Sequence, residues 1–189
     1  YGNNESSTKE WELVLGRSFS ELRLILDKLS EAIDYPLKAL NDLNTSQIKD
    51  LTGLTSKDID LALDRHWSVP FLNPPDNKKT ELNNYLDKYQ INIYQGNRMS
   101  HLLDRASHKG NAVLELIKYS KKTDVKIVAL GDSPNDLPLL EIADIPIVIP
   151  GIKGPNKFLL DNINKEKIVV AKQPHSLGWS TTINDLLFN

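Results

Sequence analysis

Cysteine is absent from the 189 residues, which excludes disulfide bonds and metal sites built on thiolates. Long apolar segments are absent too, because stretches such as residues 125–130 and 145–149 are too short to span a bilayer. Neither sign of charge is in excess: 23 Lys and Arg against 25 Asp and Glu give a net charge of −2. We therefore expect no nucleic-acid or membrane partner. No basic region followed by an apolar stretch marks a secretory signal, so we expect a cytoplasmic protein.

The first part of the chain, residues 1–105, predicts a mixed α+β domain. Apolar residues recur at helical spacing between residues 19 and 33. A sheet with one face open to solvent is expected beside the helices. Further helices are expected from residue 45 and at residues 55–63 and 79–89, and strands at residues 12–15, 35–40, 67–72 and 91–94.

The second part, residues 106–189, has a different pattern. Its expected strands are mainly apolar and rich in branched residues, and they alternate with helices at residues 110–121, 136–143, 157–162 and 181–188. Such alternation is typical of a parallel sheet covered on both faces. An α/β fold results, with a domain boundary near Arg105. The strands are expected at residues 125–130, 145–149 and 167–171.

An acidic motif follows the first of these strands: Gly131-Asp132-Ser133-Pro134-Asn135-Asp136. In parallel sheets, ligands bind at the carboxyl ends of the strands, where Asp132 is expected. Carboxylate oxygens are ligands that Mg²⁺ prefers. The alternative is a polar turn that caps the next helix, with Asp136 as its first-turn acid.

A lysine at the start of the preceding helix gives a second signal, in Ser107-His108-Lys109-Gly110. A cation at a helix N-terminus opposes the helix dipole. This placement is favourable if a phosphate lies between Lys109 and the first free N–H groups. The alternative is a solvated surface lysine.

Two motifs in the first domain carry arginines: Arg65-His66-Trp67-Ser68 and Gln95-Gly96-Asn97-Arg98-Met99-Ser100-His101. Arginine suits a carboxylate or phosphate, which accepts two parallel hydrogen bonds. The alternatives are surface or ion-paired arginines, a structural His101 and a Trp67 that packs in the core.

These motifs together resemble those of haloacid dehalogenase (HAD) phosphatases, in particular the mannosyl-3-phosphoglycerate phosphatases. The acidic motif is similar to the fourth HAD motif, and Lys109 to the third-motif lysine, with His108 where the family has Asp. Residues 138–146 and Gly178-Trp179 also fit, so the resemblance begins near Trp11. It implies a Rossmann-like core with an inserted α+β cap domain, and Mg²⁺-dependent hydrolysis of a sugar phosphate.

The resemblance implies a small phosphorylated substrate: mannosyl-3-phosphoglycerate or its glucosyl analogue, cleaved to the glycosylglycerate, a compatible solute, and phosphate. It assigns catalysis to Lys109 and Asp132, phosphate binding to Lys109 and Asn135, and Mg²⁺ to Asp132 and Asp136. In the cap, substrate would be bound by Arg65, Ser68, Arg98 and His101. The sequence departs from the family pattern at His66, Val69, Asn97 and Met99.

The nucleophile of these enzymes is the first Asp of an Asp-x-Asp pair after an apolar strand. The only such pair here, Asp58-Ile59-Asp60, falls in a predicted amphipathic helix. We therefore expect the catalytic pair upstream of Tyr1 and no activity from these residues alone. The alternatives are a non-catalytic HAD remnant that binds sugar phosphates, and a phosphatase or mutase of another sugar phosphate. An upstream Asp-x-Asp-x-Thr would indicate an enzyme, and a methionine just before Tyr1 the remnant.

Overall fold

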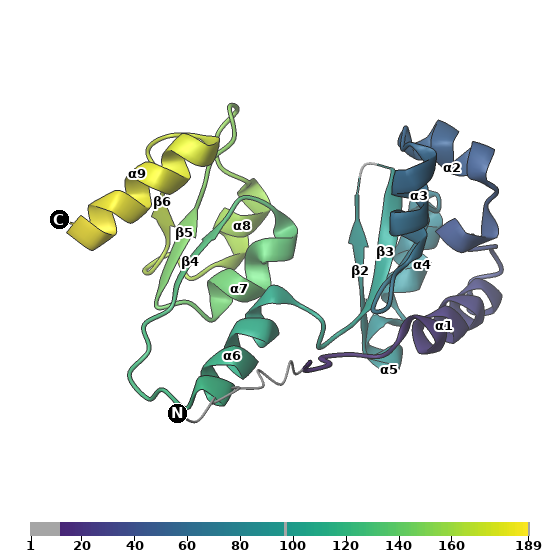
Figure 1. The fold of residues 1–189 in the computed structure, drawn as a ribbon, viewed down its shortest axis with the longest axis horizontal. Helices are drawn as coiled ribbons and strands as arrows, with labels where there is room; N and C mark the ends of the chain where they lie inside the picture. Colours follow the sequence, from purple (N-terminus) through teal and green to yellow (C-terminus); the bar gives the residue numbers. More distant parts are fainter. Residues whose placement is uncertain (1–11, 97, 189) are drawn as a thin grey trace, which may run out of the picture.

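The computed structural model describes residues 12–96 and 98–188, arranged in two domains (Figure 1). Trp11 and Asn97, noted in the sequence motifs, lie outside the described residues. The first domain, the cap, contains an antiparallel sheet in the order β1-β3-β2. Its strands are β1 (Val69–Leu72), β2 (Ile91–Gln95) and β3 (Met99–Asp104). The cap helices are α1 (Phe19–Ala32), α2 (Thr45–Thr52), α3 (Ser56–Leu63), α4 (Asp76–Asn83) and α5 (Leu86–Tyr89).

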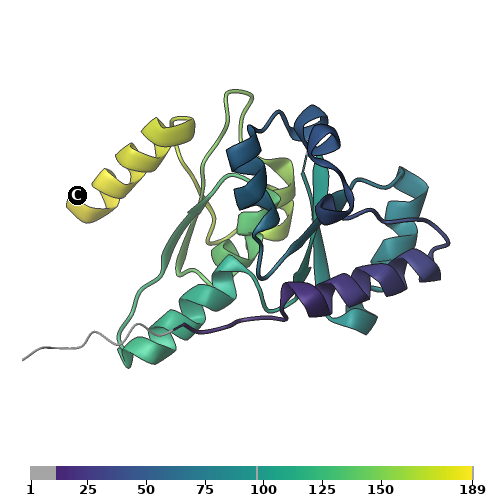
Figure 2. The same cartoon turned by 45° about the vertical axis from the view of Figure 1, so that its right-hand side comes forward.

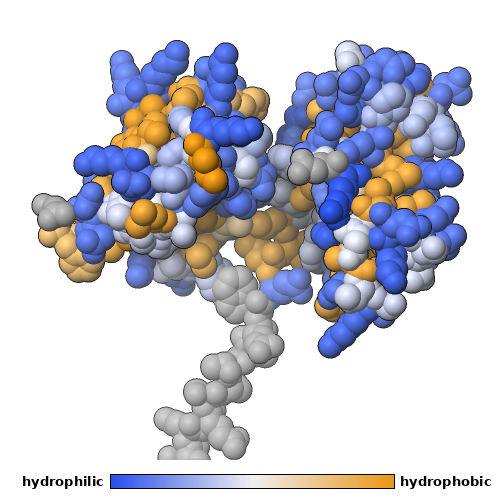
Figure 3. Space-filling view, turned by 90° about the horizontal axis from the view of Figure 1, so that it is seen from above, coloured by the Kyte–Doolittle hydropathy of each residue, from blue (hydrophilic) through white to orange (hydrophobic). Residues whose placement is uncertain are grey.

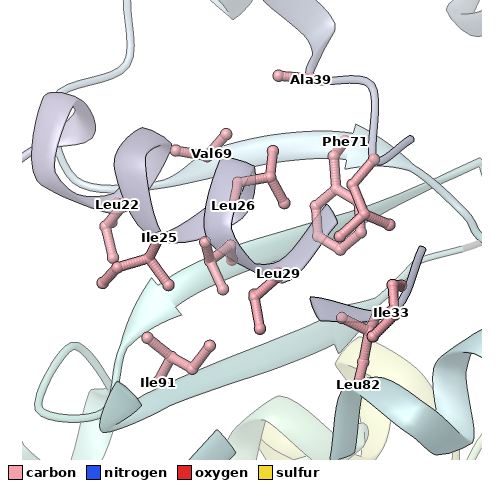
Figure 4. Packing of buried hydrophobic residues seen from close by; sticks show 12 residues of the cluster. Leu22, Ile25, Leu26, Leu29, Ile33, Ala39, Val69, Phe71, Leu82 and Ile91 are labelled. Atoms are coloured by element: carbon pink, nitrogen blue, oxygen red, sulfur yellow. The ribbon is translucent and has the colours of Figure 1, made fainter. Parts of the chain in front are cut away.

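Helix α1 covers one face of the cap sheet (Figure 4). Its buried residues lie three or four positions apart, which places them on one side of the helix. They pack against side chains of all three strands in one hydrophobic cluster. Ser18 and Glu21 form a capping box that fixes where the helix begins. The helix contributes Leu22, Ile25, Leu26 and Leu29, and the strands contribute Val69, Phe71, Ile91 and Leu102.

The other face of the cap sheet is turned towards the second domain, and Figure 1 shows β2 and β3 on that side. The register places Tyr94 of β2 opposite His101 of β3. Cross-strand partners point to the same face of a sheet. This face therefore presents polar and aromatic side chains to the space between the domains.

The second domain is built on a parallel sheet in the order β4-β5-β6. Its strands are β4 (Val128–Gly131), β5 (Ile145–Val148) and β6 (Val169–Val170). Ala129, Leu140, Val148 and Leu159 are buried together between the sheet and its helices. The helices are α6 (Lys109–Ser120), α7 (Leu137–Glu141), α8 (Lys157–Asn162) and α9 (His175–Phe188). Figure 2 shows α6 beside the segment that enters the cap.

Strand β4 is an edge strand among the described residues. Val128 on this strand is 38% exposed, and Leu114 and Leu116 of α6 are exposed as well. An edge strand with apolar side chains leaves backbone groups and hydrophobic surface open to a further element.

In the described part of the chain, no helix is long and apolar enough to cross a membrane.

Several expected elements need correction. The expected strand at residues 12–15 is wrong, because these residues have no partner strand. The expected strand at residues 35–40 is also wrong: one isolated bridge joins Ala39 to Phe71, and a 3₁₀ helix follows at Leu40–Asp42. The expected helix at residues 79–89 is two helices, because the chain turns at Asn84 and Tyr85 after α4.

The helix expected at residues 136–143 begins instead as a 3₁₀ turn, Pro134–Asp136, which leads into α7. Strand β3 was not expected from its mixed polar sequence. The other expected helices and strands are present, with shifted ends.

Candidate active site

The acidic loop after β4 is organised around Asp136. This residue is only 4% exposed, and its Oδ2 accepts hydrogen bonds from the backbone N–H groups of Asp132 (3.1 Å) and Ser133 (3.2 Å) and from the Ser133 hydroxyl (3.1 Å). A Cβ at Gly131 would lie 2.5 Å from that of Asp136. Glycine is therefore required for the chain to leave the strand and turn back over this carboxylate.

Lys109 provides the second half of this arrangement. Its Nζ donates to Asp136 Oδ1 at 2.5 Å. The adjacent Gly110 explains how the two meet: a Cβ there would lie 2.1 Å from the Pro138 carbonyl oxygen, so only glycine lets α6 approach the start of α7 so closely. The Lys109 side chain remains 54% exposed, and its ammonium group therefore also faces the space between the domains.

Asp136 is ionised at neutral pH. Burial by itself would raise the pKa of this carboxyl, but the hydrogen bonds from Lys109 and from the Asp132 and Ser133 backbone, with the lysine charge, lower the pKa below its ordinary value. Hydrogen bonds to the charged form have this effect. The carboxylate thus holds Lys109 and the loop in place.

The neighbouring Asp132 differs. It is exposed at the carboxyl end of β4, and its carboxylate accepts no hydrogen bond from the described residues. No three His, Cys, Asp or Glu side chains within the described ranges gather as a metal-binding group. The donor set therefore fits Mg²⁺ in part. Asp132 offers one free carboxylate, whereas both oxygens of Asp136 are already engaged.

A cleft of about 680 Å³ lies between the cap and the second domain. The space-filling view shows the molecule hollowed there, with hydrophobic residues gathered inside (Figure 3). The cleft brings together predicted residues from both domains: Arg65, Ser68 and His101 of the cap with Lys109 and Asn135 of the second domain. Trp67 and Tyr94 also line it.

His101 is an uncharged group at neutral pH. It is partly buried in the cleft wall, and burial, followed by the positive charge of Arg65, lowers the pKa of its imidazole. Arg65 donates from Nε to the Ala62 carbonyl at 3.1 Å, and its side chain lines the same cleft. The cap wall therefore combines one permanent cation with a neutral imidazole.

The sequence did not single out Tyr94, and its Trp67 pattern favoured packing. Trp67 is 39% exposed and faces the cleft. The signal for Tyr94 was its place opposite His101 in adjacent strands, which the sequence could show only once β3 was recognised.

Arg98 is not brought to the cleft. It lies just before β3, and its Nη1 donates to the Thr52 carbonyl at the end of α2. Asp58 and Asp60 are exposed on α3, where Asp58 accepts from Thr55, its N-cap residue. Neither carboxylate lines the cleft. This agrees with the helical interpretation of the Asp-x-Asp pair.

Comparison with known proteins gives a consistent result. Residues 72–150 match a family described as haloacid dehalogenase-like hydrolase. A glucosyl-3-phosphoglycerate/mannosyl-3-phosphoglycerate phosphatase from Persephonella marina is 31% identical over 172 residues, which cover 89% of this chain and 62% of the relative. A protein of the same description from Methanococcoides burtonii is 27% identical over 175 residues, which cover 91% of this chain and 63% of the relative.

A solved structure supports the fold. A phosphatase of the HAD enzyme superfamily from Bacteroides thetaiotaomicron superposes with a TM-score of 0.61 at 12% identity, covering 89% of this chain and 65% of that one. The chain thus spans less than two thirds of the length of the two curated relatives it matches.

Proposed function

We propose that this chain, whose sequence and fold are those of a haloacid dehalogenase-like hydrolase, supplies the cap and the phosphate-binding loop of a sugar-phosphate phosphatase. One observation carries the proposal: a single cleft contains Lys109 and Asn135 from one domain and Arg65, Ser68 and His101 from the other. Names of the two curated relatives suggest mannosyl-3-phosphoglycerate or glucosyl-3-phosphoglycerate as the substrate.

The phosphate would bind beside Lys109. The buried Asp136 carboxylate holds the ammonium group, and about half of the lysine side chain stays exposed to the cleft. A fixed cation that faces the phosphoryl oxygens stabilises the charge that develops there in the transition state. Asn135, in the same loop, would donate a hydrogen bond to the phosphate or hold the loop in place.

Asp132 would hold Mg²⁺, with Asp136 positioning the loop beneath it. When bound, the ion would neutralise charge on the phosphoryl oxygens. One carboxylate is too few for a complete Mg²⁺ site, although the ion commonly keeps several waters and uses substrate phosphate as a ligand. The remaining protein ligands would come from residues outside this sequence.

The sugar and glycerate would bind against the cap. Arg65 can pair with the glycerate carboxylate by two parallel hydrogen bonds. Neutral His101 and the Ser68 hydroxyl can hydrogen-bond to sugar hydroxyls, and Trp67 offers an apolar face for the ring. The product would then be a glycosylglycerate, consistent with compatible-solute synthesis.

The proposal also requires an attacking carboxylate from an Asp-x-Asp pair, and the pair in this sequence, Asp58 and Asp60, lies exposed on α3 of the cap. A segment outside this sequence would provide it, with the general acid two residues later. The position of this Asp-x-Asp pair away from the cleft also favours one rival function: a non-catalytic protein that binds sugar phosphates in this cleft.

The test is a phosphate-release assay on a protein extended to the length of the curated relatives. We expect turnover of mannosyl- or glucosyl-3-phosphoglycerate that a metal chelator abolishes and Lys109→Ala strongly reduces. The matched control is Lys118→Ala, a lysine on the exposed side of the same helix. Binding of these esters without release of phosphate would support the non-catalytic rival. Faster turnover of an unrelated sugar phosphate would retain the chemistry and replace the substrate.

A further inference from the structure

Two segments, here called the linkers, lie side by side where the cap meets the second domain. Residues 14–18 enter the cap, and residues 104–108 leave it. A Cβ at Gly16 would lie 2.2 Å from the Ser107 hydroxyl oxygen and 2.6 Å from the Asp104 Cβ. The close approach of the two linkers therefore depends on glycine at this position.

An ion pair joins the linkers at the crossing. Arg17 of the entering linker donates from Nε to Oδ2 of Asp104 at the end of β3. The pair is largely buried, with the two side chains 29% and 14% exposed. The same guanidinium group donates from Nη2 to the Tyr89 carbonyl (2.8 Å) and the Gln90 carbonyl (2.5 Å). One arginine thus binds both the exit of β3 and the turn between α5 and β2.

The leaving linker is attached to that same turn. The Arg105 backbone N–H donates to the Gln90 carbonyl at 3.0 Å, and Arg105 Nη2 lies 2.7 Å from Asp87 Oδ1. Arginines from both linkers therefore hold the end of α5, and the two crossings are fixed to one point of the cap.

The contacts continue from this crossing to the phosphate-binding helix. Asp104 Oδ1 accepts from the Ala106 backbone N–H at 2.9 Å. The Ala106 carbonyl in turn accepts from the Asn111 side chain on α6 at 2.8 Å. Only four residues separate Asp104 from Lys109. The orientation of α6 is thus linked by hydrogen bonds to the cap.

We infer that Arg17 and Asp104 form a positioning pair that sets the orientation of the cap relative to helix α6. Neither residue lines the cleft, so the pair acts through the linkers and has no contact with substrate. The inference rests on the proposed function only in that α6 is taken to begin at the phosphate-binding site. It can be tested without measuring phosphate release.

The absence of cysteine from the sequence allows a direct test. Spin labels at Ser46→Cys on α2 and Lys118→Cys on α6 report the distance between cap and helix by pulsed electron resonance. We expect one narrow distance distribution in the otherwise unchanged chain, and a broader or shifted distribution after Arg17→Ala. Arg17→Lys keeps the charge and should restore much of the narrow distribution.

Matched controls separate positioning from general stability. Arg23→Ala removes an ion pair with Asp42 that lies entirely within the cap, and it should leave the distribution unchanged. Gly16→Ala should broaden it, whereas Gly151→Ala has room for a Cβ and should not. Circular dichroism confirms that each variant is folded, and if Arg17→Ala is not, Gly16→Ala and Arg17→Gln provide the test. An unchanged distribution in folded Arg17 and Gly16 variants would overturn the inference, even if the protein proved to be a phosphatase. Conversely, loss of the narrow distribution would support it even if the assay for sugar-phosphate hydrolysis failed.

Discussion

Replacing Asp136 with Asn tests how the acidic loop is held together. The carboxylate accepts from Lys109, from two backbone N–H groups and from the Ser133 hydroxyl. Asparagine has only one acceptor oxygen. Its NH₂ group must therefore face either Lys109 or the backbone N–H groups, which are all donors. If the oxygen faces the backbone, Lys109 loses its partner and turns to solvent.

The expected cost follows from these contacts. A hydrogen bond to a charged group contributes about 1.5–3 kcal/mol. The lysine side chain is 54% exposed, so its share is reduced by solvent screening. We expect Asp136→Asn to lower the free energy of unfolding by about 2 kcal/mol, with a fall in Tm of about 4–8 °C for a chain of this size.

Urea unfolding followed by circular dichroism measures this difference. The matched control is Asp161→Asn, an exposed carboxylate on α8, which should change stability by less than about 0.5 kcal/mol. An Asp136→Asn variant as stable as the control would refute the assigned role of this carboxylate.

The pH dependence of the difference gives an independent check. The pKa of Asp136 is lowered from its ordinary value of 3.8 in the folded protein. The stability that this group contributes is therefore fully present above about pH 3.8 and is lost as the pH falls through the lowered folded pKa. The difference in free energy of unfolding between the unchanged protein and Asp136→Asn should therefore become smaller in that acidic range.

Three further predictions concern the cleft. Lys109→Ala should lower turnover by about 10²–10³-fold with little effect on the KM of the extended enzyme, and equal kcat in Lys109→Ala and Lys118→Ala would contradict a role in chemistry. Arg65→Ala should raise the KM for phosphoglycerate glycosides and leave the KM for a small generic phosphate ester unchanged. Arg98→Ala should instead lower Tm and leave both KM values unchanged. A raised KM in Arg98→Ala with an unchanged KM in Arg65→Ala would exchange the two roles. The pKa of His101 is lowered from 6.5 by burial and then by the charge of Arg65, so protonation of this imidazole opposes folding. The free energy of unfolding should therefore fall as the pH drops below about 6.5. Unfolding curves of His101→Gln should lack this pH dependence.

The contacts of the phosphate-binding region could be anticipated in part from the sequence. Lys109 and the acidic loop were expected to be neighbours because the resemblance to HAD phosphatases assigns phosphate binding to both Lys109 and Asn135. The direct pair between Lys109 and Asp136 was not expected. Asp136 was expected to bind metal because it belongs to the acidic motif. A motif gives residue types, but it does not show which donors already reach each carboxylate oxygen.

The cap was harder to anticipate for a physical reason. Strand β3 is mixed polar and apolar because one face packs on α1 and the other faces the cleft, so its sequence resembled a loop motif. Arg98 lies in a conspicuous motif, yet a backbone carbonyl 46 residues away binds it. Such long-range pairing cannot be read from local spacing. The linker pair of Arg17 and Asp104, 87 positions apart, was missed for the same cause.

The central claim is that the cleft between the two domains binds a phosphate ester at the start of α6. Titration of this chain with inorganic phosphate and Mg²⁺, followed by backbone amide NMR, tests it most directly. The account predicts saturable shifts at Gly110, Asn111 and the loop from Asp132 to Asn135, lost in Lys109→Ala, with amides of α2 and α3 unchanged. Shifts confined to other surfaces, or identical shifts in Lys109→Ala, would contradict it.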